Sequence, residues 1–286
     1  MGRVVILGIF VADTAYRAER QPRMGETILG RSFALGPGGK GSNQAVAAAM
    51  AGAEAHIVTR LGRDAFADIA LATWGRAGVQ LAVTRSDSYT GAAYIFIEEA
   101  TGNNAIIVAQ GAAAEISAAD VEANADLIGV ARVFVTQLEQ PIPAALRGLQ
   151  IARGAGVTTI LNPAPAADLP AGMLALCDYV TPNESEAEAL TGLPVASPEQ
   201  ARAAARALLA AGAGAAVITL GGQGALFHDG TQTVHVPIYR AGPVVETTGA
   251  GDAFNGGFAA ALAAGMAPVD AVRFGSATAG ISVTRP

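Results

Sequence analysis

A short run of small residues near the end of the sequence could bind an anion. Gly249, Ala250 and Gly251 stand directly before an apolar segment, so that no large side chain covers their backbone amides. Amide N–H groups at the start of a helix converge with the positive end of the helix dipole, and this arrangement binds phosphate. The sequence therefore predicts a phosphate-binding helix start at this position.

Asp252 falls in the first turn of the same predicted helix. A carboxylate beside an anion site is electrostatically unfavourable, which makes sense if it accepts a proton from an attacking hydroxyl group. The alternative is an acidic residue that only complements the helix dipole. The flanking Gly-Ala-Gly favours the first interpretation, with Asp252 as a general base.

A second glycine-rich segment, at 36–41, precedes another predicted helix at 43–50, which Ser42 would cap. Glycines let the backbone approach a ligand closely, and Lys40 and Asn43 can donate hydrogen bonds to hydroxyl groups. Lys40 is the only lysine among the 18 basic residues. We interpret this as a need for a compact ammonium group where a planar guanidinium would not serve. A flexible turn before a helix is the alternative, and it leaves the unique lysine unexplained.

Two other nucleotide-binding motifs do not fit. A dinucleotide-binding fingerprint requires Gly-x-Gly-x-x-Gly after an early strand, whereas here Phe254 takes the last position and the motif lies in the last fifth of the chain. The sequence also contains no Gly-x-x-x-x-Gly-Lys-Ser/Thr motif of the Walker type.

The elements that must position these residues alternate between strands and helices. Strands are predicted at 4–7, 55–60, 133–135, 157–161, 179–180 and 216–220. Helices are predicted at 65–77, 117–128, 144–153, 184–190, 198–211 and after Gly249 and Pro268. Such alternation predicts an α/β fold, with a mostly parallel sheet and helices on both faces. We expect residues 1–286 to form one domain.

Two segments, at about 14–34 and 90–108, interrupt this alternation. Apolar runs at 92–97 and 104–108 flank a turn at 101–104, as in a β-hairpin. We therefore predict a small β lid that stands off the main sheet. Its apolar face would need either a substrate or a second copy of the protein to cover it.

Charge and hydropathy limit the function classes. The net charge is −6 and no basic tract occurs, which argues against nucleic acid as a partner. The apolar run at 4–7 is too short to cross a bilayer and lacks the pattern of a signal peptide, so we expect a cytoplasmic protein without a membrane partner. Cys177 is the single cysteine and cannot form an internal disulfide.

The two glycine motifs together resemble the ribokinase (PfkB) family of carbohydrate kinases. The resemblance rests on Gly38-Gly-Lys-Gly-Ser-Asn-Gln44 and Thr247-Thr-Gly-Ala-Gly-Asp-Ala-Phe254, and extends over nearly the whole chain through the segments at 162–165, 181–186 and 219–224. It implies a ribokinase-like α/β fold and an ATP-dependent phosphotransferase. The implied acceptor is a primary hydroxyl of a small sugar, with ribose or a related pentose as the expected substrate.

The resemblance also implies roles for individual residues. Asp252 would be the general base, and the backbone of Gly249, Ala250 and Gly251 would form the anion hole. The implied sugar contacts are Asp13, Gly39, Lys40, Asn43, Glu139 and Asp252. The implied ATP contacts are Asn183, Thr219, Leu220, Gly221, Gly222, Gln223, Gly224, Gly251 and Ser276. The expected cofactors are ATP and Mg²⁺, the latter held by Glu186 through water, with a possible K⁺ site at Glu246, Thr248, Ser282 and Arg285. A homodimer through the lid is the expected assembly.

Three positions depart from the ribokinase pattern. Val11 replaces an asparagine that contacts the sugar, Glu246 replaces an aspartate at the monovalent-cation site, and the sequence ends at Pro286, where relatives continue. The missing asparagine leaves a nucleoside kinase or a keto-deoxy-sugar kinase of the same fold as alternatives. The early end leaves a non-catalytic sugar-binding relative as a third.

Overall fold

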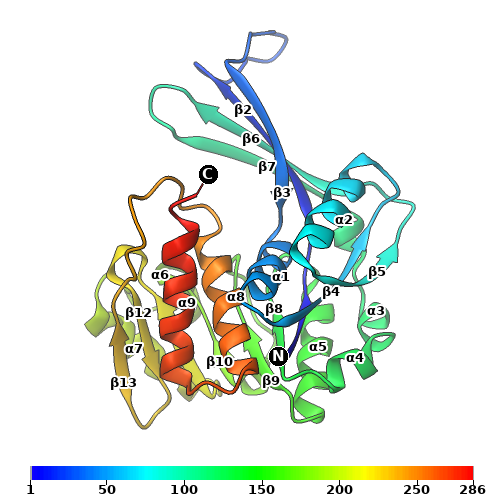
Figure 1. Ribbon diagram of the computed structural model, residues 1–286. Coiled ribbons are helices and arrows are strands. Elements are labelled where there is room, and N and C mark those ends of the chain that lie inside the picture. The colour runs from blue at the N-terminus through cyan, green and yellow to red at the C-terminus, as the bar shows by residue number, and fades with distance from the viewer. Residues whose placement is uncertain (1, 286) are drawn as a thin grey trace.

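The computed structural model describes residues 2–285, and within them the chain forms a nine-stranded sheet in the order β13-β12-β11-β10-β9-β8-β1-β4-β5 (Figure 1). Seven strands run parallel: β1 (Arg3–Leu7), β4 (Glu54–Leu61), β5 (Gln80–Arg85), β8 (Val133–Thr136), β9 (Thr158–Leu161), β10 (Tyr179–Val180) and β11 (Ala215–Thr219). Two antiparallel strands, β12 (Ala225–His228) and β13 (Thr233–Val236), extend one edge.

Helices cover both faces of this sheet. The apolar cluster on one face contains residues of α1 (Lys40–Met50), α2 (Ala65–Ala77), α8 (Ala250–Ala263) and α9 (Pro268–Ser282). The clusters on the other face contain residues of α3 (Ala118–Glu122), α4 (Ala125–Gly129), α5 (Ile142–Gly154), α6 (Glu184–Thr191) and α7 (Pro198–Ala210). The predicted fold class is confirmed.

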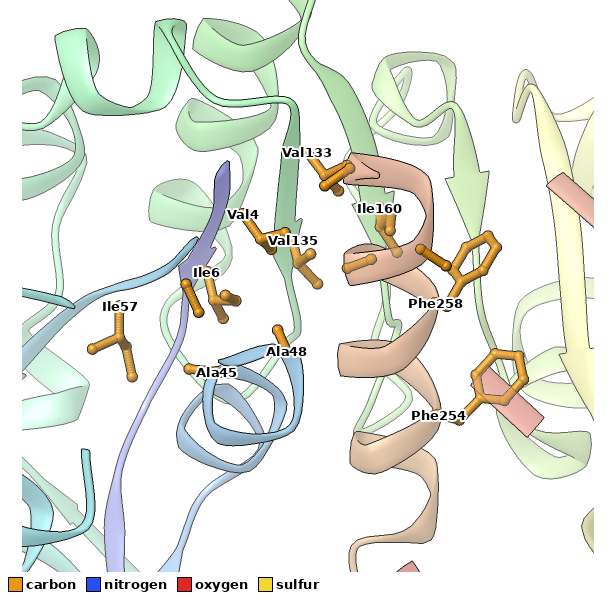
Figure 2. Close-up of a cluster of buried hydrophobic side chains, with 14 of the residues drawn as sticks. Val4, Ile6, Ala45, Ala48, Ile57, Val133, Val135, Ile160, Phe254 and Phe258 are labelled. Carbon is orange, nitrogen blue, oxygen red and sulfur yellow. The ribbon is translucent and has the colours of Figure 1, made fainter. Parts of the chain in front are cut away.

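Strand β1 shows why the sequence reads as a continuous apolar run there. Val4 and Ile6 belong to the cluster under α1 and α8, whereas Val5 and Leu7 belong to the cluster on the opposite face. Successive side chains of a strand point to opposite faces, and a strand covered on both faces must therefore be apolar at every position. Figure 2 shows the first of these layers, between the sheet and helices α1 and α8.

A separate four-stranded sheet has the order β3-β2-β6-β7, with β2 (Val11–Ala18), β3 (Ser32–Gly38), β6 (Thr90–Glu98) and β7 (Asn104–Gly111). Figure 1 shows this sheet standing away from the main body, as the sequence predicted. Strand β2 follows β1 closely, and β3 ends one residue before Gly39, where α1 is about to begin. The lid is therefore joined directly to the glycine-rich segment.

The start of α1 differs from the prediction. The helix begins at Lys40 and not at residue 43, and the Ser42 hydroxyl accepts a hydrogen bond from Trp74 Nε1 (2.9 Å) instead of capping the helix. Gly39 has φ 89°, a left-handed conformation that favours glycine and turns the chain from β3 into the helix. Glu139 Oε2 accepts the Lys40 N–H (2.8 Å). A carboxylate from a distant segment thus replaces the expected local cap.

The helix predicted at 117–128 is two short helices. Ser117 does cap α3, in a capping box with Asp120, but the Asn124 side chain donates to the Asp120 carbonyl (2.8 Å), and α4 starts only after it. A side chain that bonds to a preceding carbonyl competes with the helical ladder.

Strands β5, β12 and β13 were not predicted. No helix within residues 2–285 is long and apolar enough to cross a membrane.

Candidate active site

Polar side chains follow directly after several neighbouring strands of the main sheet. Gln137 follows β8, Asn162 follows β9 and Thr181 follows β10. The carboxyl ends of these parallel strands meet at one edge of the sheet, where ligands of open α/β folds bind. The lid stands beyond the same edge in Figure 1. The starts of α1 and α8 carry the two glycine-rich motifs to this edge.

The start of α8 has the properties of an anion site. Its N-cap is Gly249, in the left-handed region at φ 77°, and no side chain caps the helix. The first amides of a helix have no intrahelical acceptor, so amides here remain available to a ligand. Ala250 is a partial exception, because its N–H lies 3.2 Å from the Thr247 carbonyl. The amides of Gly251 and Asp252 are the stronger candidates for binding an anion.

The Asp252 carboxylate lies beside these amides and is only 7% exposed. Its Oδ2 accepts a hydrogen bond from Asn43 Nδ2 (3.1 Å), and its Oδ1 accepts one from Gln44 Nε2 (3.0 Å). Burial raises the pKa of Asp252, while the Lys40 charge and the two amide donors oppose that rise. A raised pKa brings a carboxyl group closer to the range in which it works as a base at neutral pH.

Asp13, Lys40 and Glu139 lie in one electrostatic cluster with Asp252. Burial raises the pKa of Glu139, which the Lys40 amide and charge lower and the charges of Asp252 and Asp13 raise further. Burial also raises the pKa of Asp13 to about 6. The structure thus brings together residues that lie up to 239 positions apart in the printed sequence.

Two glycines in this cluster have no room for a side chain. A Cβ atom on Gly38 would lie 2.3 Å from Asp13 Oδ2, and one on Gly39 would lie 2.7 Å from the Ile9 carbonyl oxygen. The Asp13 carboxylate therefore occupies the space beside the glycine backbone. This explains why glycine precedes Lys40 at both positions.

Asn183 and Glu186 form the N-terminus of α6. Asn183 Oδ1 accepts the Glu186 N–H (2.9 Å), and Glu186 Oε2 accepts the Asn183 N–H (2.9 Å), which is a capping box. Glu186 is 8% exposed, and its pKa is raised by burial, with the Lys40 charge opposing the rise. Both residues therefore have a structural role in addition to the ligand contacts predicted for them.

Glu186 fits a magnesium site in which the protein supplies few ligands. Magnesium prefers oxygen ligands and commonly uses one or two carboxylates together with phosphate oxygens and water. No group of three or more Asp, Glu, His or Cys residues that could hold a metal occurs within residues 2–285. Substrate phosphates and water would have to complete the coordination.

The segment at 219–224 connects β11 to β12 in a tight turn. The Leu220 N–H donates to the Gly224 carbonyl (2.8 Å), and a Cβ on Gly224 would lie 2.1 Å from the Val236 carbonyl oxygen. Gly221, Gly222 and Gln223 are exposed at the tip, whereas Leu220 and Gly224 are buried and Thr219 is half-buried. The tip is exposed to a ligand, although the Gln223 N–H already donates to the Leu220 carbonyl (2.8 Å) and the Gly221 carbonyl accepts the Gly224 N–H (3.2 Å). Ser276, also predicted to contact ATP, is buried on α9.

The four residues predicted to hold K⁺ lie close together, but several of their oxygens are already engaged. Glu246 Oε1 accepts hydrogen bonds from the amides of Thr247 and Thr248 and from the Thr248 hydroxyl, and these bonds lower the pKa of Glu246. The Ser282 carbonyl accepts the Arg285 N–H (3.1 Å). These bonds engage one of the two carboxylate oxygens of Glu246 and one lone pair of the Ser282 carbonyl, and the K⁺ site stays a prediction from the sequence.

The sequence analysis missed the amide side chains behind Asp252. Gln44, Gln137 and Asn162 are buried and hydrogen-bonded to one another, and Gln44 contacts the Asp252 carboxylate. A signal was present, because Gln137 and Asn162 are polar residues directly after buried parallel strands. Gln44 gave only a weak signal, as one more polar residue in a helix.

Comparisons with known proteins find similarity over nearly the whole chain. The sequence profile of the pfkB family of carbohydrate kinases matches residues 1–286. A ribokinase of Staphylococcus aureus is 37% identical over 287 residues, which cover 99% of this chain and 94% of that protein. A deoxyribokinase of Salmonella typhi is 36% identical over 259 residues, covering 90% of this chain and 84% of that protein. The structure of Arabidopsis thaliana ribokinase complexed with ribose and ATP superposes with a TM-score of 0.92, at 30% identity, over 99% of this chain and 93% of that one.

Proposed function

The chain belongs to the pfkB family of carbohydrate kinases, and on that basis we propose that it transfers the γ-phosphoryl group of ATP to a primary hydroxyl of ribose or a related pentose. The observation that carries the proposal is the position of Asp252, a nearly buried carboxylate in the first turn of an uncapped helix. A base beside an anion site is the minimum that phosphoryl transfer to an alcohol requires. The relatives named ribokinase and deoxyribokinase support a pentose as the acceptor.

In the proposed reaction, Asp252 accepts the proton of the sugar hydroxyl as its oxygen forms a bond to the γ-phosphorus. The bond from that phosphorus to the bridging oxygen breaks, and ADP leaves with the electron pair. The amides at the start of α8 face the charge of the transferred group. Asn183, Ser276 and the exposed tip of the 219–224 turn would contact the nucleotide. Magnesium, which Glu186 would hold through water, supplies neutralisation of phosphate charge when it is bound.

Val11 bears on the choice of pentose. Val11 is 5% exposed and lies opposite Gly38, two residues before Lys40, in the pairing of β2 with β3. A Cβ atom on Gly91 would lie 3.0 Å from Val11 Cγ1. An apolar side chain cannot form a hydrogen bond with a hydroxyl group. A pentose that lacks one hydroxyl therefore loses little binding free energy at this position. We expect kcat/KM for ribose and for deoxyribose to agree within about tenfold.

A substrate panel tests the function. Purified protein with ATP and Mg²⁺ is assayed for ADP formation with ribose, deoxyribose, adenosine and a keto-deoxy sugar. We expect the highest kcat/KM with a pentose. A preference for adenosine or for the keto-deoxy sugar would establish one of the alternatives of the same fold. Calorimetric binding of a sugar without ADP formation would identify a non-catalytic relative.

The proposed sugar contact of Asp13 predicts a pH dependence. Its pKa of about 6 means that the carboxylate is charged above pH 6 and becomes neutral as the pH falls through that value. A charged carboxylate accepts stronger hydrogen bonds from hydroxyl groups than a neutral carboxyl group does. Sugar affinity, measured by calorimetry without nucleotide, should therefore be constant from pH 7 to 8 and weaken below about 6.

The matching variant is Asp13→Asn. It should bind the sugar weakly at every pH and show no change in affinity near pH 6. If the variant keeps the dependence of the wild-type protein, another group is responsible and Asp13 does not bind the sugar through its charge.

The homodimer through the lid belongs to this proposal as well. Tyr16 and Phe33 stand opposite each other on β2 and β3 with 41% and 56% of their surfaces exposed, and Ile107 of β7 is 67% exposed. An uncovered apolar sheet face favours a protein partner, and a second lid has the required surface. Analytical ultracentrifugation that finds only monomer at micromolar concentration would rule this out.

We propose the cytoplasm as the location, because the reaction consumes ATP.

A further inference from the structure

The Asp252 carboxylate accepts a hydrogen bond from the last member of a chain of buried side-chain amides. The donor and acceptor ends of each amide in this chain are determined by its partners. The chain begins at the Thr181 carbonyl, which can only accept a hydrogen bond and receives one from Asn162 Nδ2 (2.9 Å). The Asn162 side chain must therefore present its Oδ1 at the other end. That oxygen accepts from Gln44 Nε2 at 3.1 Å.

Gln44 uses both of its donor hydrogens and its acceptor oxygen in this position. One Nε2 hydrogen faces Asn162 Oδ1, the other faces Asp252 Oδ1 (3.0 Å), and Gln44 Oε1 accepts from Gln137 Nε2 (2.6 Å). A rotated amide would set its oxygen against two acceptor oxygens. Gln44 is fully buried, so water cannot substitute for any of these partners.

The orientation of Gln44 leaves one buried oxygen of Gln137 without a hydrogen-bond donor within residues 2–285. Gln137 Oε1 is buried and receives no hydrogen bond from the residues that the structure describes. A Cβ on Gly8 would lie 2.3 Å from this oxygen, so glycine leaves the space that it occupies. Turning the Gln137 amide would satisfy nothing, because its oxygen would then oppose Gln44 Oε1. The unsatisfied oxygen is therefore a consequence of orienting Gln44.

The two oxygens of Asp252 have different surroundings. Oδ1 is held by fully buried Gln44, whereas Oδ2 is bonded to Asn43, which is only partly buried. Thr181 also holds the backbone of this turn, since its hydroxyl donates to Asn255 Oδ1 (2.6 Å) and Asn255 Nδ2 donates to the Gly251 carbonyl (2.8 Å). Hydrogen bonds that begin at Thr181 thus hold both the Asp252 carboxylate and the first turn of α8. The Oδ2 atom lies on the less buried side of the carboxylate.

We propose that Gln44 is a positioning residue, which holds Asp252 Oδ1 so that Oδ2 takes the proton of the substrate hydroxyl. This inference rests on the proposed function, because it assigns a role in the same reaction. Gln44 acts only through Asp252 and touches neither the sugar nor ATP. Its loss should lower kcat and leave both KM values nearly unchanged.

The decisive readout is the pH profile of kcat. Three charged groups interact with the Asp252 carboxylate. Lys40 is the cation, and the two carboxylates are Glu139, in the segment after β8, and Glu186 on α6. These groups remain in Gln44→Met. The substitution removes the donor at Oδ1 and also leaves Asn162 Oδ1 and Gln137 Nε2 without their Gln44 partner. The ionised carboxylate then loses a partner that its protonated form does not need, so protonation becomes easier. We expect kcat to fall about tenfold and its acid limb to move up by about one pH unit.

Ser42→Ala is the matched control. Ser42 is 1% exposed on the same helix, and its hydroxyl accepts the N–H of Trp74 on α2 (2.9 Å). The substitution also breaks a buried hydrogen bond of α1 and should lower the melting temperature, but it should leave the acid limb where it is in the wild-type protein. A shift of equal size in both variants would assign the effect to loosening of α1 and overturn the proposal.

Gln137→Met serves if Gln44→Met does not fold. It removes the unsatisfied Gln137 oxygen but leaves Gln44 Oε1 without a donor, so one buried unsatisfied oxygen replaces another and the protein should lose only the one hydrogen bond. The acid limb should move in the same direction by less. A wild-type protein that phosphorylates no member of the substrate panel contradicts the proposed function itself. An active wild-type protein whose Gln44→Met or Gln137→Met variant keeps its kcat and acid limb contradicts only the positioning role.

Discussion

Replacing Asp252 by asparagine should reduce kcat for sugar phosphorylation by about 10²-fold or more, while the KM for ATP stays close to that of the wild-type protein. The reason is that an amide cannot accept the hydroxyl proton, although it fills nearly the same volume. The carboxylate accepts one hydrogen bond on each oxygen, from Asn43 and Gln44. An asparagine can accept only one of the two, because its Nδ2 would face the second donor. Steady-state kinetics across a pH series measure the effect.

The pH profile gives this prediction a second, independent check. The base must be ionised to work, so kcat of the wild-type protein falls as the pH drops through the pKa of Asp252, which burial raises. The asparagine variant has no such group, and the residual activity should lack that acid limb. A variant that turns over at the wild-type rate, or that keeps the same limb, removes Asp252 from the role of base.

Asp270→Asn is the control for the dipole interpretation of an acidic first-turn residue. Asp270 lies in the first turn of α9, is exposed and pairs with Arg273. The substitution removes a charge of the same kind from a helix start far from the amide chain. Activity should not change, and stability should fall by no more than about 1 kcal/mol. The contrast separates a base from a residue that only complements a helix dipole.

Replacing Lys40 by methionine should lower kcat/KM by about 10²-fold or more, because three carboxylates then lose the positive charge that faces them. The Lys40 charge lowers the pKa values of Asp252, Glu139 and Glu186, each of which burial raises. Without it, all three carboxyl groups hold protons to higher pH, and the acid limb of activity moves upward. The loss of the hydrogen bond that Lys40 is predicted to donate to a sugar hydroxyl adds to the effect.

Lys40→Arg tests whether the unique lysine reflects chemistry. Lys40 is half-buried and follows two glycines whose lack of a Cβ makes room for Asp13 and for the chain near Ile9. A planar guanidinium is larger than an ammonium group and distributes its charge differently. We expect Lys40→Arg to remain at least about tenfold below the wild-type kcat/KM. Arg206→Lys, on the exposed surface of α7, should change nothing. Full activity of Lys40→Arg would make the single lysine an accident of composition.

Periodicity was sufficient for most of the main sheet. The run at 4–7 is apolar at every position because β1 is covered on both faces, and this pattern survives in the sequence regardless of which helices do the covering. Strands β12 and β13 were missed because they are short and run antiparallel at an edge, where the βα alternation no longer applies. The lid was predicted as a hairpin, and only the structure shows β2 pairing in parallel with β6 across a long separation.

The proposed base and the proposed anion site could be singled out from the sequence, because both depend on neighbours in the chain. Small residues bare the amides of a helix start, and a carboxylate in the same turn is necessarily close to them. Lys40 could be singled out for a similar reason, since its residue type alone is unusual here. For α8 this glycine-rich geometry lies within a few residues of the chain. The start of α1 was predicted three residues too late, because its cap comes from the distant Glu139.

What holds that base could be decided only by the tertiary structure. Gln44, Gln137, Asn162 and Asp252 come from four separate segments, and their hydrogen bonds span up to 208 positions of the chain. The cap of α1 likewise comes from Glu139, which is 99 positions away from Lys40. A sequence shows which side chains can donate or accept, but the partner of a buried polar group depends on which strand ends the fold brings to the same edge of the sheet.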